Sequence, residues 1–568
     1  MSALDGLDAR QREAASVLRG PVAVLAGAGT GKTRVITHRI AHGVETGAYS
    51  PARVMAVTFT AKAAGELRGR LRALGVEGVA ARTFHAAALS QLNFFWPQLA
   101  GNPAPRIVDN KVRLLAQAAD TLRIRPDTAT LRDVAAEIEW RKVSMLSIEE
   151  AAARGRAVGR LDPQALADIA RAYEALKDER HQLDFEDVLL ACAGMLETEA
   201  RVAAAVREQY RHFTVDEFQD VSPLQNRLLE LWLGERRDLC VVGDASQTIY
   251  SFAGADQRFL LDFERTYPDA TVVRLETNYR SAEPVLAAAN ALMRGRPGAL
   301  ELVPARAYPQ AEPPTVTAFD LDTDEAAGVA ASISRRLAEG VQAQDVAVLY
   351  RAHSQSALIL QALAVRGIAA TVLGGKRFFD MPEVRQAVLA LRGAAVAPTD
   401  RGFLPAVRDV LRGLGFTDDP PEAGGALRDG WEARRALLQL AEDAGPGMTL
   451  RTFSDALLAR AKDQHEPAMQ TVTLSTLHAA KGLEWPHVYL AGWSEGLLPI
   501  SYATGLDAVD EERRLAYVGI TRAARTLAVS WSRESARAER RASRFLGEIG
   551  NGILRESAPS ARRAAPPR

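Results

Sequence analysis

Residues 26–33 read Ala-Gly-Ala-Gly-Thr-Gly-Lys-Thr, and this stretch decides the fold class of the chain. It fits the phosphate-loop pattern G-x-x-x-x-G-K-[ST], with Ala26 in the place of the first glycine. Small residues let the backbone wrap closely around a phosphate with its N–H groups pointing inward. Lys32 offers a positive charge to the β- and γ-phosphates, and the Thr33 hydroxyl can ligate Mg²⁺. The alternative is a flexible Gly/Ala turn.

The residues on either side of the loop favour the phosphate site. Val22–Leu25 is an apolar run suited to a buried strand, and Thr33–Val44 has the apolar spacing of a helix. Strand, loop and helix in this order are what phosphate binding at a helix N-terminus requires. The sequence therefore predicts a nucleotide triphosphate site here.

A second strand-like run ends in two acidic residues. Phe213–Val215 leads directly into Asp216 and Glu217. Asp216 can hold the Mg²⁺ that Thr33 also contacts, and Glu217 can orient and deprotonate the attacking water. The alternative, a solvated acidic turn, is disfavoured beside a phosphate loop. Further along, Gln247 follows another apolar run and can sense the γ-phosphate through a hydrogen bond.

The composition excludes several classes of protein. The 70 Lys and Arg residues balance the 70 Asp and Glu residues, so polyanion binding must come from local patches. A hydrophobic content of 47% is ample for large cores and excludes a disordered chain. The length of 568 residues predicts about three to four domains.

Features that report on the cellular compartment point to the cytoplasm. Cys192 and Cys240 lie in apolar surroundings without a C-x-x-C pattern, as expected for reduced core residues. Met1–Arg10 lacks the apolar segment of a signal peptide, and no apolar run reaches membrane length. We therefore expect a cytoplasmic protein with no membrane partner.

Apolar strand-like runs alternate with helical patterns, and this alternation is typical of parallel sheets. The expected strands are Val22–Leu25, Val54–Phe59, Phe213–Val215, Leu239–Val242, Thr315–Phe319, Val346–Tyr350, Thr471–Ser475 and Val488–Ala491. Ala88–Lys177 reads as helical without a convincing strand, and a second helical stretch covers roughly residues 380–470. The prediction is an α/β fold with two doubly wound parallel-sheet domains, each carrying a helical insertion.

The predicted domain bounds follow from this alternation. They are residues 1–87 and 179–281 for the first core, 88–178 for its helical insertion, 282–379 and 471–550 for the second core, 380–470 for its short insertion, and 551–568 for a disordered tail.

An ordered series of motifs runs from Gln11 to Arg522. The segments are LDARQREAA, AGAGTGKTRVITHRI, VTFTAKAAGELRGRL, TFHAAAL, VDEFQD, VGDASQTIYSFAGA, LETNYRS, TLHAAKGLEW and EERRLAYVGITRA. Together they resemble the motifs of superfamily-one DNA helicases of the UvrD/Rep/PcrA type over nearly the whole chain. Within that family the chain is most similar to the second UvrD paralogue of actinobacteria, through VGDASQTIYSFAGA and a short second insertion. The resemblance implies two RecA-like domains.

The resemblance also implies roles for residues at an ATP site. Gln11 reads the adenine by a hydrogen bond, Tyr279 stacks on it, and Glu484 accepts from the ribose hydroxyl. Arg280 and Arg522 reach the γ-phosphate, where a guanidinium stabilises charge on the transferring phosphoryl oxygens. Arg522 belongs to the second core, so closure of the two cores would couple ATP state to domain spacing. The phosphates are held by Ala26, Gly27, Ala28, Gly29, Thr30, Gly31, Lys32, Thr33 and Arg34.

Aromatic and hydroxyl side chains in the matched motifs predict a path for single-stranded DNA. Aromatic rings stack on any base and so bind a strand without reading its sequence. The expected stacking residues are Phe59, His85, Tyr250, Phe252 and His478, and the expected phosphate contacts are Thr58, Thr60 and Thr83. Relatives often have Trp-Arg where this chain has Phe252-Ala253, which removes a cation and reduces the stacking surface.

Three weaker patterns have structural explanations. His38 and His42 are four residues apart on a helix, but no Glu or Cys completes a metal site, so a structural role is favoured. The acids of 184–187 are best explained as a helix start. Asn110-Lys111 lacks the Asp of a guanine-specific pocket, so GTP is not favoured.

The functional prediction is an ATP- and Mg²⁺-dependent helicase that moves 3′→5′ on single-stranded DNA, acts on tailed duplexes, and serves repair or replication with protein partners that the sequence does not name. Three alternatives stay open. They are a translocase that strips proteins from DNA without unwinding, an ATP-gated DNA-binding scaffold, and an enzyme that acts on RNA. The intact Lys32, Glu217 and Arg522 argue against the scaffold. The sequence offers no residue recognisable as a contact for the ribose 2′-hydroxyl, so nothing in it favours RNA.

Overall fold

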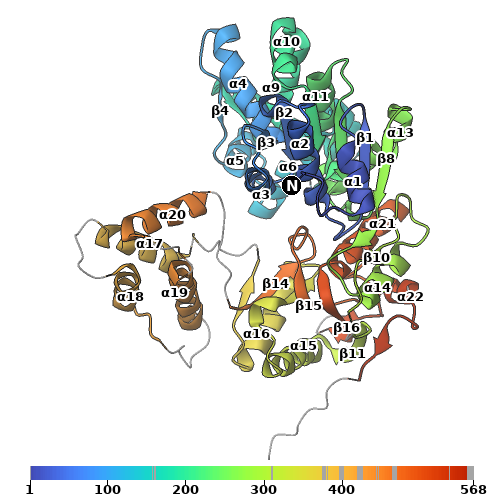
Figure 1. The fold of residues 1–568 in the computed structure, drawn as a ribbon, viewed down its shortest axis with the longest axis vertical. Helices are drawn as coiled ribbons and strands as arrows, with labels where there is room; N and C mark the ends of the chain where they lie inside the picture. Colours follow the sequence, from blue (N-terminus) through green and yellow to red (C-terminus); the bar gives the residue numbers. More distant parts are fainter. Residues whose placement is uncertain are drawn as a thin grey trace, which may run out of the picture. The chain divides into compact units, whose positions relative to one another are not determined.

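Two groups of parallel strands organise the chain, each in a separate unit (Figure 1). In this computed structural model, unit 1 comprises Met1–Glu276 with Pro297–Leu300, and unit 2 comprises Thr277–Arg296 with Glu301–Arg568. The structure describes residues 2–155, 158, 161–308, 311–373, 379, 381–395, 402–418, 426–442, 444, 447–462, 470–535 and 538–558.

The sheet of unit 1 has six strands in the order β3-β2-β6-β7-β1-β8, and all of its pairs are parallel. The strands are β1 (Val22–Ala26), β2 (Val54–Thr58), β3 (Ala80–Thr83), β6 (His212–Val215), β7 (Leu239–Gly243) and β8 (Thr271–Leu275). Parallel neighbours need crossover connections over the faces of the sheet. The loop that follows β1 therefore leaves the sheet between β7 and β8.

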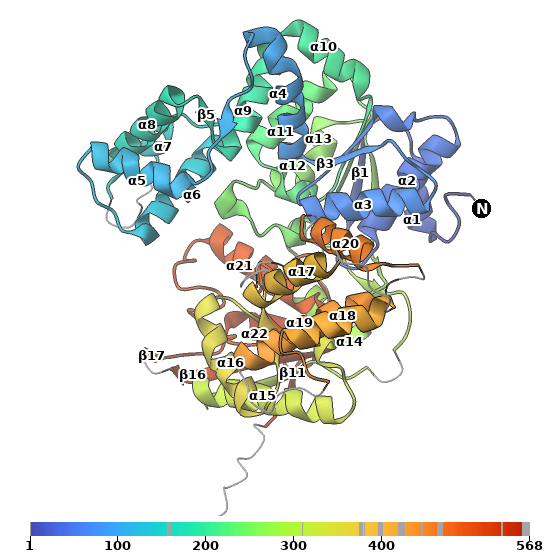
Figure 2. The same ribbon diagram turned by 90° about the vertical axis from the view of Figure 1, so that its left-hand side faces the viewer.

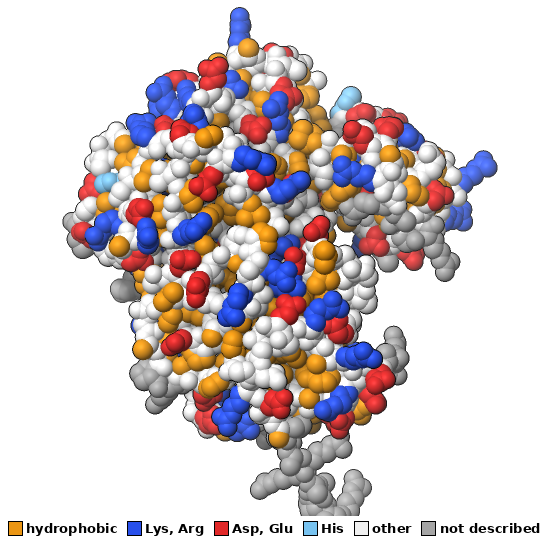
Figure 3. Space-filling model, turned by 90° about the vertical axis from the view of Figure 1, so that its right-hand side faces the viewer, with side chains coloured by type: hydrophobic (Ala, Val, Ile, Leu, Met, Phe, Trp, Pro, Cys, Tyr) orange, Lys and Arg blue, Asp and Glu red, His pale blue; other side chains and the backbone are white. Residues whose placement is uncertain are grey.

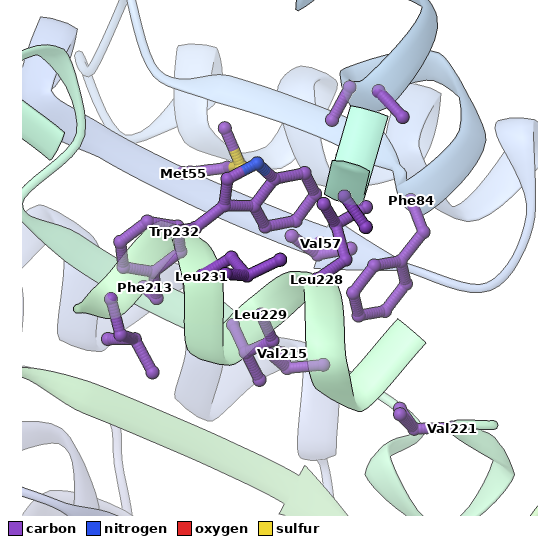
Figure 4. Packing of buried hydrophobic residues seen from close by; sticks show 14 of the residues in the cluster. Met55, Val57, Phe84, Phe213, Val215, Val221, Leu228, Leu229, Leu231 and Trp232 are labelled. Atoms are coloured by element: carbon purple, nitrogen blue, oxygen red, sulfur yellow. The ribbon is translucent and has the colours of Figure 1, made fainter. Parts of the chain in front are cut away.

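Helices cover both faces of this sheet, because alternate strand residues point to opposite sides. One face packs against α1 (Ala9–Ser16), α2 (Lys32–Glu45) and α3 (Ala61–Ala73). The other face packs against α4 (Phe84–Ala100), α9 (Phe185–Thr198), α10 (Ala200–Gln209), α11 (Pro223–Leu233), α12 (Arg258–Leu261) and α13 (Phe263–Thr266). Trp232 of α11 is fully buried there, between Met55 and Phe213 of the strands and Phe84 of α4 (Figure 4).

A helical insertion of unit 1 has a core of its own. It contains α5 (Lys111–Thr121), α6 (Thr128–Val143), α7 (Ile148–Ala153) and α8 (Pro163–Glu179), which lie together to one side of the sheet (Figure 2). Leu115, Ile138 and Ile169 are buried between these helices. Two short strands, β4 (Arg106–Ile107) and β5 (Gln182–Leu183), pair in parallel at its base.

The sheet of unit 2 follows the order β13-β14-β12-β15-β16-β11-β18, and β17 adds to β16 in antiparallel register. Its strands are β11 (Thr315–Leu321), β12 (Val346–Tyr350), β13 (Ala370–Val372), β14 (Val472–Thr476), β15 (Trp485–Leu490), β16 (Ala523–Ser535), β17 (Ala538–Glu539) and β18 (Arg555–Glu556). A separate parallel pair, β9 (Thr277–Asn278) and β10 (Val303–Pro304), opens the unit.

Helices flank the sheet of unit 2 and also form its insertion. α15 (Asp322–Ala338) and α16 (Ser356–Val365) pack on one face. α21 (Leu506–Ile520) packs closely on the sheet, since a Cβ at Gly519 would lie 2.5 Å from Leu477, just after β14, and 3.2 Å from Leu490 of β15. α14 (Glu283–Met293) and α22 (Arg544–Ile549) complete the core unit, and α17 (Pro382–Ala394), α18 (Phe403–Gly413), α19 (Ala426–Glu442) and α20 (Leu450–Lys462) share a separate hydrophobic core.

Short 3-10 helices shape the loops at the strand ends. They are η1 (Pro51–Arg53), η2 (Phe218–Asp220), η3 (Ala245–Gln247), η4 (Ser251–Ala253), η5 (Ala343–Asp345) and η6 (His353–Gln355).

The predicted α/β fold class with parallel sheets is confirmed, but three details of the prediction are wrong. β3, β8 and β16 lie outside every predicted strand, because their mixed polar and apolar residues lack a continuous apolar run. The stretch 88–177, predicted to be helical with no convincing strand, contains the short strand β4, which is stabilised by its partner β5 from about seventy-five residues later. Part of the predicted disordered tail is an edge strand, since β18 pairs with β11. Residues 559–568 of that tail lie outside the described residues.

Two observations concern the cysteines and the helix lengths. Cys192 and Cys240 are both buried and carry free thiols, and burial raises the pKa of Cys192 to about 12. Among the helices that the structure describes, none combines the length and apolar character needed to cross a membrane.

Candidate ATP and DNA sites

The phosphate loop joins the C-terminal end of β1 to the start of α2. Gly31 has φ +87° at the N-cap of α2, and a Cβ at that position would lie 2.8 Å from Nε2 of Gln11. Only glycine combines this left-handed backbone with the available space. Thr30 Oγ1 donates a hydrogen bond to the Gly27 carbonyl oxygen (2.8 Å), which holds the loop closed. The free N–H groups at the start of α2 then face the predicted phosphate position.

Gln11 connects the start of α1 with this loop. Its Nε2 donates to the Thr30 carbonyl oxygen (2.9 Å), and its Oε1 accepts from the Asp8 amide (3.3 Å). The side chain is buried, although it was predicted as the adenine reader. In this structure Gln11 therefore braces the phosphate loop, and adenine reading stays a prediction.

The side chain of Lys32 in the phosphate loop is in an environment that suits an anionic ligand. Its Nζ is buried and lies 3.8 Å from Oε1 of Glu217. Within the part of the chain that the structure describes, this Nζ makes no hydrogen bond. A buried ammonium without hydrogen-bond acceptors is costly. The position therefore fits an anion such as the β- or γ-phosphate of a nucleotide.

Asp216 and Glu217 lie directly after β6, as predicted. Burial raises the pKa of Asp216 to about 7, Glu217 acts in the same direction, and Lys32 lowers it. A buried carboxylate that resists ionisation favours a nearby cation. Asp216 and the Thr33 hydroxyl are hard oxygen donors of the kind that Mg²⁺ prefers, so these residues fit the predicted ion. Glu217 itself has φ +52°, an uncommon backbone for a non-glycine residue that often marks a functional site.

Gln247 lies in η3, after the end of β7. Its Nε2 donates to Oδ2 of Asp244 (2.8 Å), and Oδ1 of Asp244 accepts from the Ser246 amide (3.0 Å). Both side chains are buried. The carboxylate of Asp244 therefore fixes the orientation of the predicted γ-phosphate sensor.

The remaining predicted nucleotide contacts belong to unit 2. Asn278 Oδ1 accepts from the backbone amides of Arg280 (2.9 Å) and Ser281 (2.7 Å), so this segment is a rigid turn. Arg280 forms an ion pair with Glu484 and donates to the Thr521 carbonyl oxygen (3.2 Å). These bonds explain why Tyr279 and Arg280 belong to unit 2. The predicted domain boundary at 281/282 instead placed them in the first core.

Arg522 is buried within unit 2. Its guanidinium donates to the carbonyl oxygens of Val518 (2.9 Å) and Leu483 (3.0 Å) and to the Thr521 hydroxyl (3.1 Å). Arg280 and Arg522 thus both contact Thr521, and Glu484 follows Leu483 directly. The structure thus brings Arg280, Arg522 and Glu484 together. Tyr279, the residue before Arg280, has a side chain that is 43% exposed.

Three of the predicted DNA-stacking residues form one aromatic group in unit 1. Phe59 stacks on Tyr250 with ring centroids 5.5 Å apart, and Tyr250 meets Phe252 edge-on at 6.1 Å. Phe59 and Phe252 are exposed. Exposed apolar rings at the ends of β2 and in η4 are suited to stacking on nucleobases.

A second aromatic pair lies at the start of α4. His85 stacks on Phe185 at 4.4 Å, and burial lowers the pKa of His85 to about 4, so its ring is neutral at neutral pH. Phe185 is exposed and was missed, because the sequence of 184–187 was interpreted only as a helix start. That interpretation is correct, since Asp184 and Asp187 form a capping box on α9. An exposed aromatic residue at a helix start was the available signal.

The predicted hydroxyl contacts differ in accessibility. Thr60 and Thr83 cap α3 and α4, and their Oγ1 atoms accept from the amides of Ala63 (3.1 Å) and Ala86 (3.2 Å). Each hydroxyl proton stays available for a phosphate oxygen. Thr58 is buried at the end of β2, so its hydroxyl does not share that surface.

His478 belongs to the turn after β14 in unit 2. Burial lowers its pKa to about 4, and the nearby positive charges of Arg351 and Lys481 act in the same direction. Its ring is therefore neutral at neutral pH, which suits stacking better than ion pairing.

The two histidines of α2 contact different groups. His38 Nδ1 lies 2.5 Å from the Ala3 carbonyl oxygen, and His42 Nδ1 lies 3.8 Å from Glu45. No cluster of three or more potential metal-binding side chains occurs in the described part of the chain.

Comparison with known proteins identifies the family. Residues 7–268 match the UvrD/REP helicase N-terminal domain, and residues 273–401 and 432–534 match the UvrD-like helicase C-terminal domain. The chain is 46% identical to the ATP-dependent DNA helicase UvrD2 of Mycobacterium tuberculosis (strain ATCC 25618 / H37Rv), over 98% of this chain and 83% of that protein.

Two further relatives are more distant. The ATP-dependent DNA helicase UvrD1 of Mycobacterium bovis is 30% identical over 99% of this chain and 88% of its own length. The ATP-dependent DNA helicase PcrA of Leuconostoc citreum is 30% identical over 97% of this chain and 85% of its own length. The higher identity to UvrD2 confirms the predicted similarity to the second UvrD paralogue. Both UvrD-type domains are thus present in order, and the chain belongs to the UvrD/REP helicase family.

Proposed function

We propose that this helicase hydrolyses ATP, with Mg²⁺, to move 3′→5′ along single-stranded DNA and to unwind tailed duplexes during DNA repair or replication in the cytoplasm. The observation that carries the proposal is the buried Nζ of Lys32, which lies in a phosphate loop 3.8 Å from Glu217 and lacks a hydrogen-bond acceptor among the described residues. The printed names of the relatives, ATP-dependent DNA helicases, support the same activity.

Residues of both units have assigned roles in this proposal. Lys32 and the loop amides bind the β- and γ-phosphates, and Thr33 with Asp216 would hold Mg²⁺, which neutralises phosphate charge when bound. Glu217 accepts a proton from the attacking water. Arg280 and Arg522 stabilise the charge that develops on the γ-phosphate. The ion pair of Arg280 with Glu484 must then open as Glu484 turns to the ribose.

The DNA strand is bound mainly by stacking in this proposal. Phe59, Tyr250 and Phe252 provide ring faces, and the hydroxyls of Thr60 and Thr83 contact phosphates. Acidic and basic side chains alternate over the face shown in Figure 3, which accords with a net charge of zero. Stacking therefore contributes a larger share of strand affinity than charge does.

The test combines ATPase and strand-displacement measurements. ATP hydrolysis is measured with and without single-stranded DNA, and unwinding is measured on duplexes with a 3′ tail or a 5′ tail. We expect DNA to stimulate hydrolysis and the 3′-tailed duplex to be unwound. No stimulation and no unwinding would overturn the proposal, and preference for the 5′ tail would overturn its direction.

The same assays separate the alternatives. Movement along DNA without strand displacement would indicate a translocase that strips proteins. Stimulation by RNA equal to that by DNA would indicate an RNA substrate.

A further inference from the structure

Gln219 occupies a position between two functional loops of unit 1. It lies in η2, two residues after Glu217, and its side chain is 0% exposed. Gln219 has no role in the proposed mechanism. Burial of a carboxamide lowers the stability of the folded protein unless its donor and its acceptor both form hydrogen bonds.

Both ends of the Gln219 carboxamide are bound, and they bind different loops. Its Nε2 donates to Oε2 of Glu217 (2.5 Å) and lies 3.4 Å from Oδ2 of Asp220. Its Oε1 accepts from the backbone amide of Asp244 (3.0 Å). The orientation of the carboxamide follows from these partners, because a carboxylate only accepts and an amide N–H only donates.

The connection continues from Asp244 into the loop that carries the aromatic group. The Asp244 carboxylate binds the side chain of Gln247 (2.8 Å), and Tyr250 follows three residues later. Tyr250 stacks on Phe59. Hydrogen bonds thus connect the proposed catalytic base through Gln219 to Asp244 and Gln247, and the short backbone segment 247–250 leads from there to the proposed DNA-stacking rings.

The space around Gln219 leaves its carboxamide little freedom. A Cβ at Gly243, the last residue of β7, would lie 2.6 Å from Oε1 and 3.3 Å from the backbone nitrogen of Gln219. A group packed this closely transmits a displacement instead of absorbing it. A shift of the Glu217 carboxylate therefore alters the hydrogen bond on Asp244.

We propose that Gln219 is a positioning residue that couples the state of Glu217 at the nucleotide to the conformation of the Asp244–Phe252 loop at the DNA. The coupling is reciprocal, so DNA bound at the loop also positions Glu217 for hydrolysis. This inference rests on the proposed function, since it assumes that Glu217 is the base and that Tyr250 and Phe252 contact the strand.

The first test replaces Gln219 by methionine, which keeps the volume and removes every hydrogen bond of the carboxamide. For Gln219→Met we expect the stimulation of ATP hydrolysis by single-stranded DNA to fall about fivefold or more, as for a typical coupling energy. The loss should appear in kcat with DNA, whereas KM for ATP changes little, because the phosphate loop keeps its contacts.

Gln91→Met is the matched control. Gln91 is also a buried glutamine of unit 1, and its Oε1 accepts from Trp232 Nε1 (2.9 Å) in the hydrophobic core. Its replacement removes a buried hydrogen bond of similar kind away from both loops. We expect this variant to lose stability while it keeps the full ratio of DNA stimulation.

A second measurement distinguishes coupling from a general loss of activity. The affinity for single-stranded DNA is measured with and without a non-hydrolysable ATP analogue. The wild type should show a ratio of affinities that differs from one, and Gln219→Met should bring that ratio close to one. A purely structural residue would weaken both affinities and leave their ratio unchanged.

Gly243→Ala provides an independent perturbation of the same carboxamide. The added methyl group pushes on Oε1 of Gln219 (2.6 Å) and on Cδ2 of Leu260 (2.9 Å) without removing any polar group. We expect the same reduction of DNA stimulation as in Gln219→Met.

The outcomes separate this inference from the proposed function. If the wild type hydrolyses ATP independently of DNA, the proposed function fails. If the wild type is stimulated and folded Gln219→Met retains the full stimulation and the full affinity ratio, only the role of Gln219 is overturned.

Discussion

In the proposed mechanism, hydrolysis depends on two single residues, Lys32 and Glu217. Lys32→Ala should abolish ATP turnover, because it removes the buried positive charge that the loop directs at the β- and γ-phosphates. Glu217→Gln should bind ATP and hydrolyse it on the order of 10²–10⁴-fold more slowly, because the water loses its base. Steady-state ATPase rates and nucleotide binding measure both effects. Hydrolysis at the wild-type rate in either variant would contradict the assignment.

A control for the carboxylate is Glu230→Gln on α11. Glu230 accepts from Asn226 (2.8 Å) on a helix that covers the sheet away from the phosphate loop. The same change of charge there should leave ATP turnover unaffected.

Phe252 tests whether the aromatic group binds DNA. Phe252→Ala should weaken single-strand affinity by about 1–3 kcal/mol if a base stacks on the ring. Phe94→Ala is the matched control, since both rings are similarly exposed (60% and 64%) in the same unit but Phe94 lies on α4. Fluorescence anisotropy of a labelled oligonucleotide measures both. Equal affinities of the two variants would show that Phe252 is a packing residue.

At the scale of elements, a buried ion cluster joins α6 and α8 of the first insertion to the start of α9. Nζ of Lys142 lies 2.7 Å from Asp184, 2.5 Å from Asp187 and 2.9 Å from Glu174, and Lys142 is 3% exposed. Lys177 binds the same acids. Removal of one cation from such a cluster leaves the buried carboxylates only partly compensated.

Lys142→Met should therefore destabilise the insertion by roughly 3–5 kcal/mol. Hydrogen exchange of the α6 and α9 amides reports the change locally. Arg171→Met serves as the control, because Arg171 pairs with Asp168 at the surface and such a pair contributes below about 1 kcal/mol. Comparable exchange rates in the two variants would contradict the importance of the cluster.

At the scale of the whole molecule, buried histidines in both units make stability depend on pH. Burial lowers the pKa of His85, His212 and His478 to about 4, below the value of about 6.5 for an exposed histidine. Between these values the unfolded chain binds more protons than the folded chain. The stability that these three histidines contribute is therefore complete above about pH 6.5 and is lost as the pH decreases toward 4.

Thermal denaturation at about pH 7.5 and about pH 5 measures this dependence. The melting temperature should be lower at the acidic pH. His212→Gln, which lies outside both proposed sites, should reduce the difference between the two temperatures. Identical melting temperatures of the wild type at both pH values would refute the prediction.

The fold class and much of the nucleotide site could be predicted because their signals are local in sequence. The loop at 26–33 and the acids after Phe213–Val215 are short segments whose residue types dictate backbone geometry and chemistry. The predicted two RecA-like parallel-sheet domains are confirmed by the sheets and by both family domains. Val346–Tyr350 was predicted with the bounds of β12 because a buried parallel strand is a continuous apolar run.

The sequence by itself determined the phosphate loop, the acidic pair and the alternation of strands and helices, since each depends on neighbouring residues. Only the tertiary structure decided which distant groups meet. Arg280 pairs with Glu484 across about two hundred residues, Phe185 stacks on His85, and Gln219 binds the amide of Asp244. The physical reason is that chain neighbours constrain local dihedral angles, whereas side-chain contacts between remote segments are set by how the sheets and helices pack.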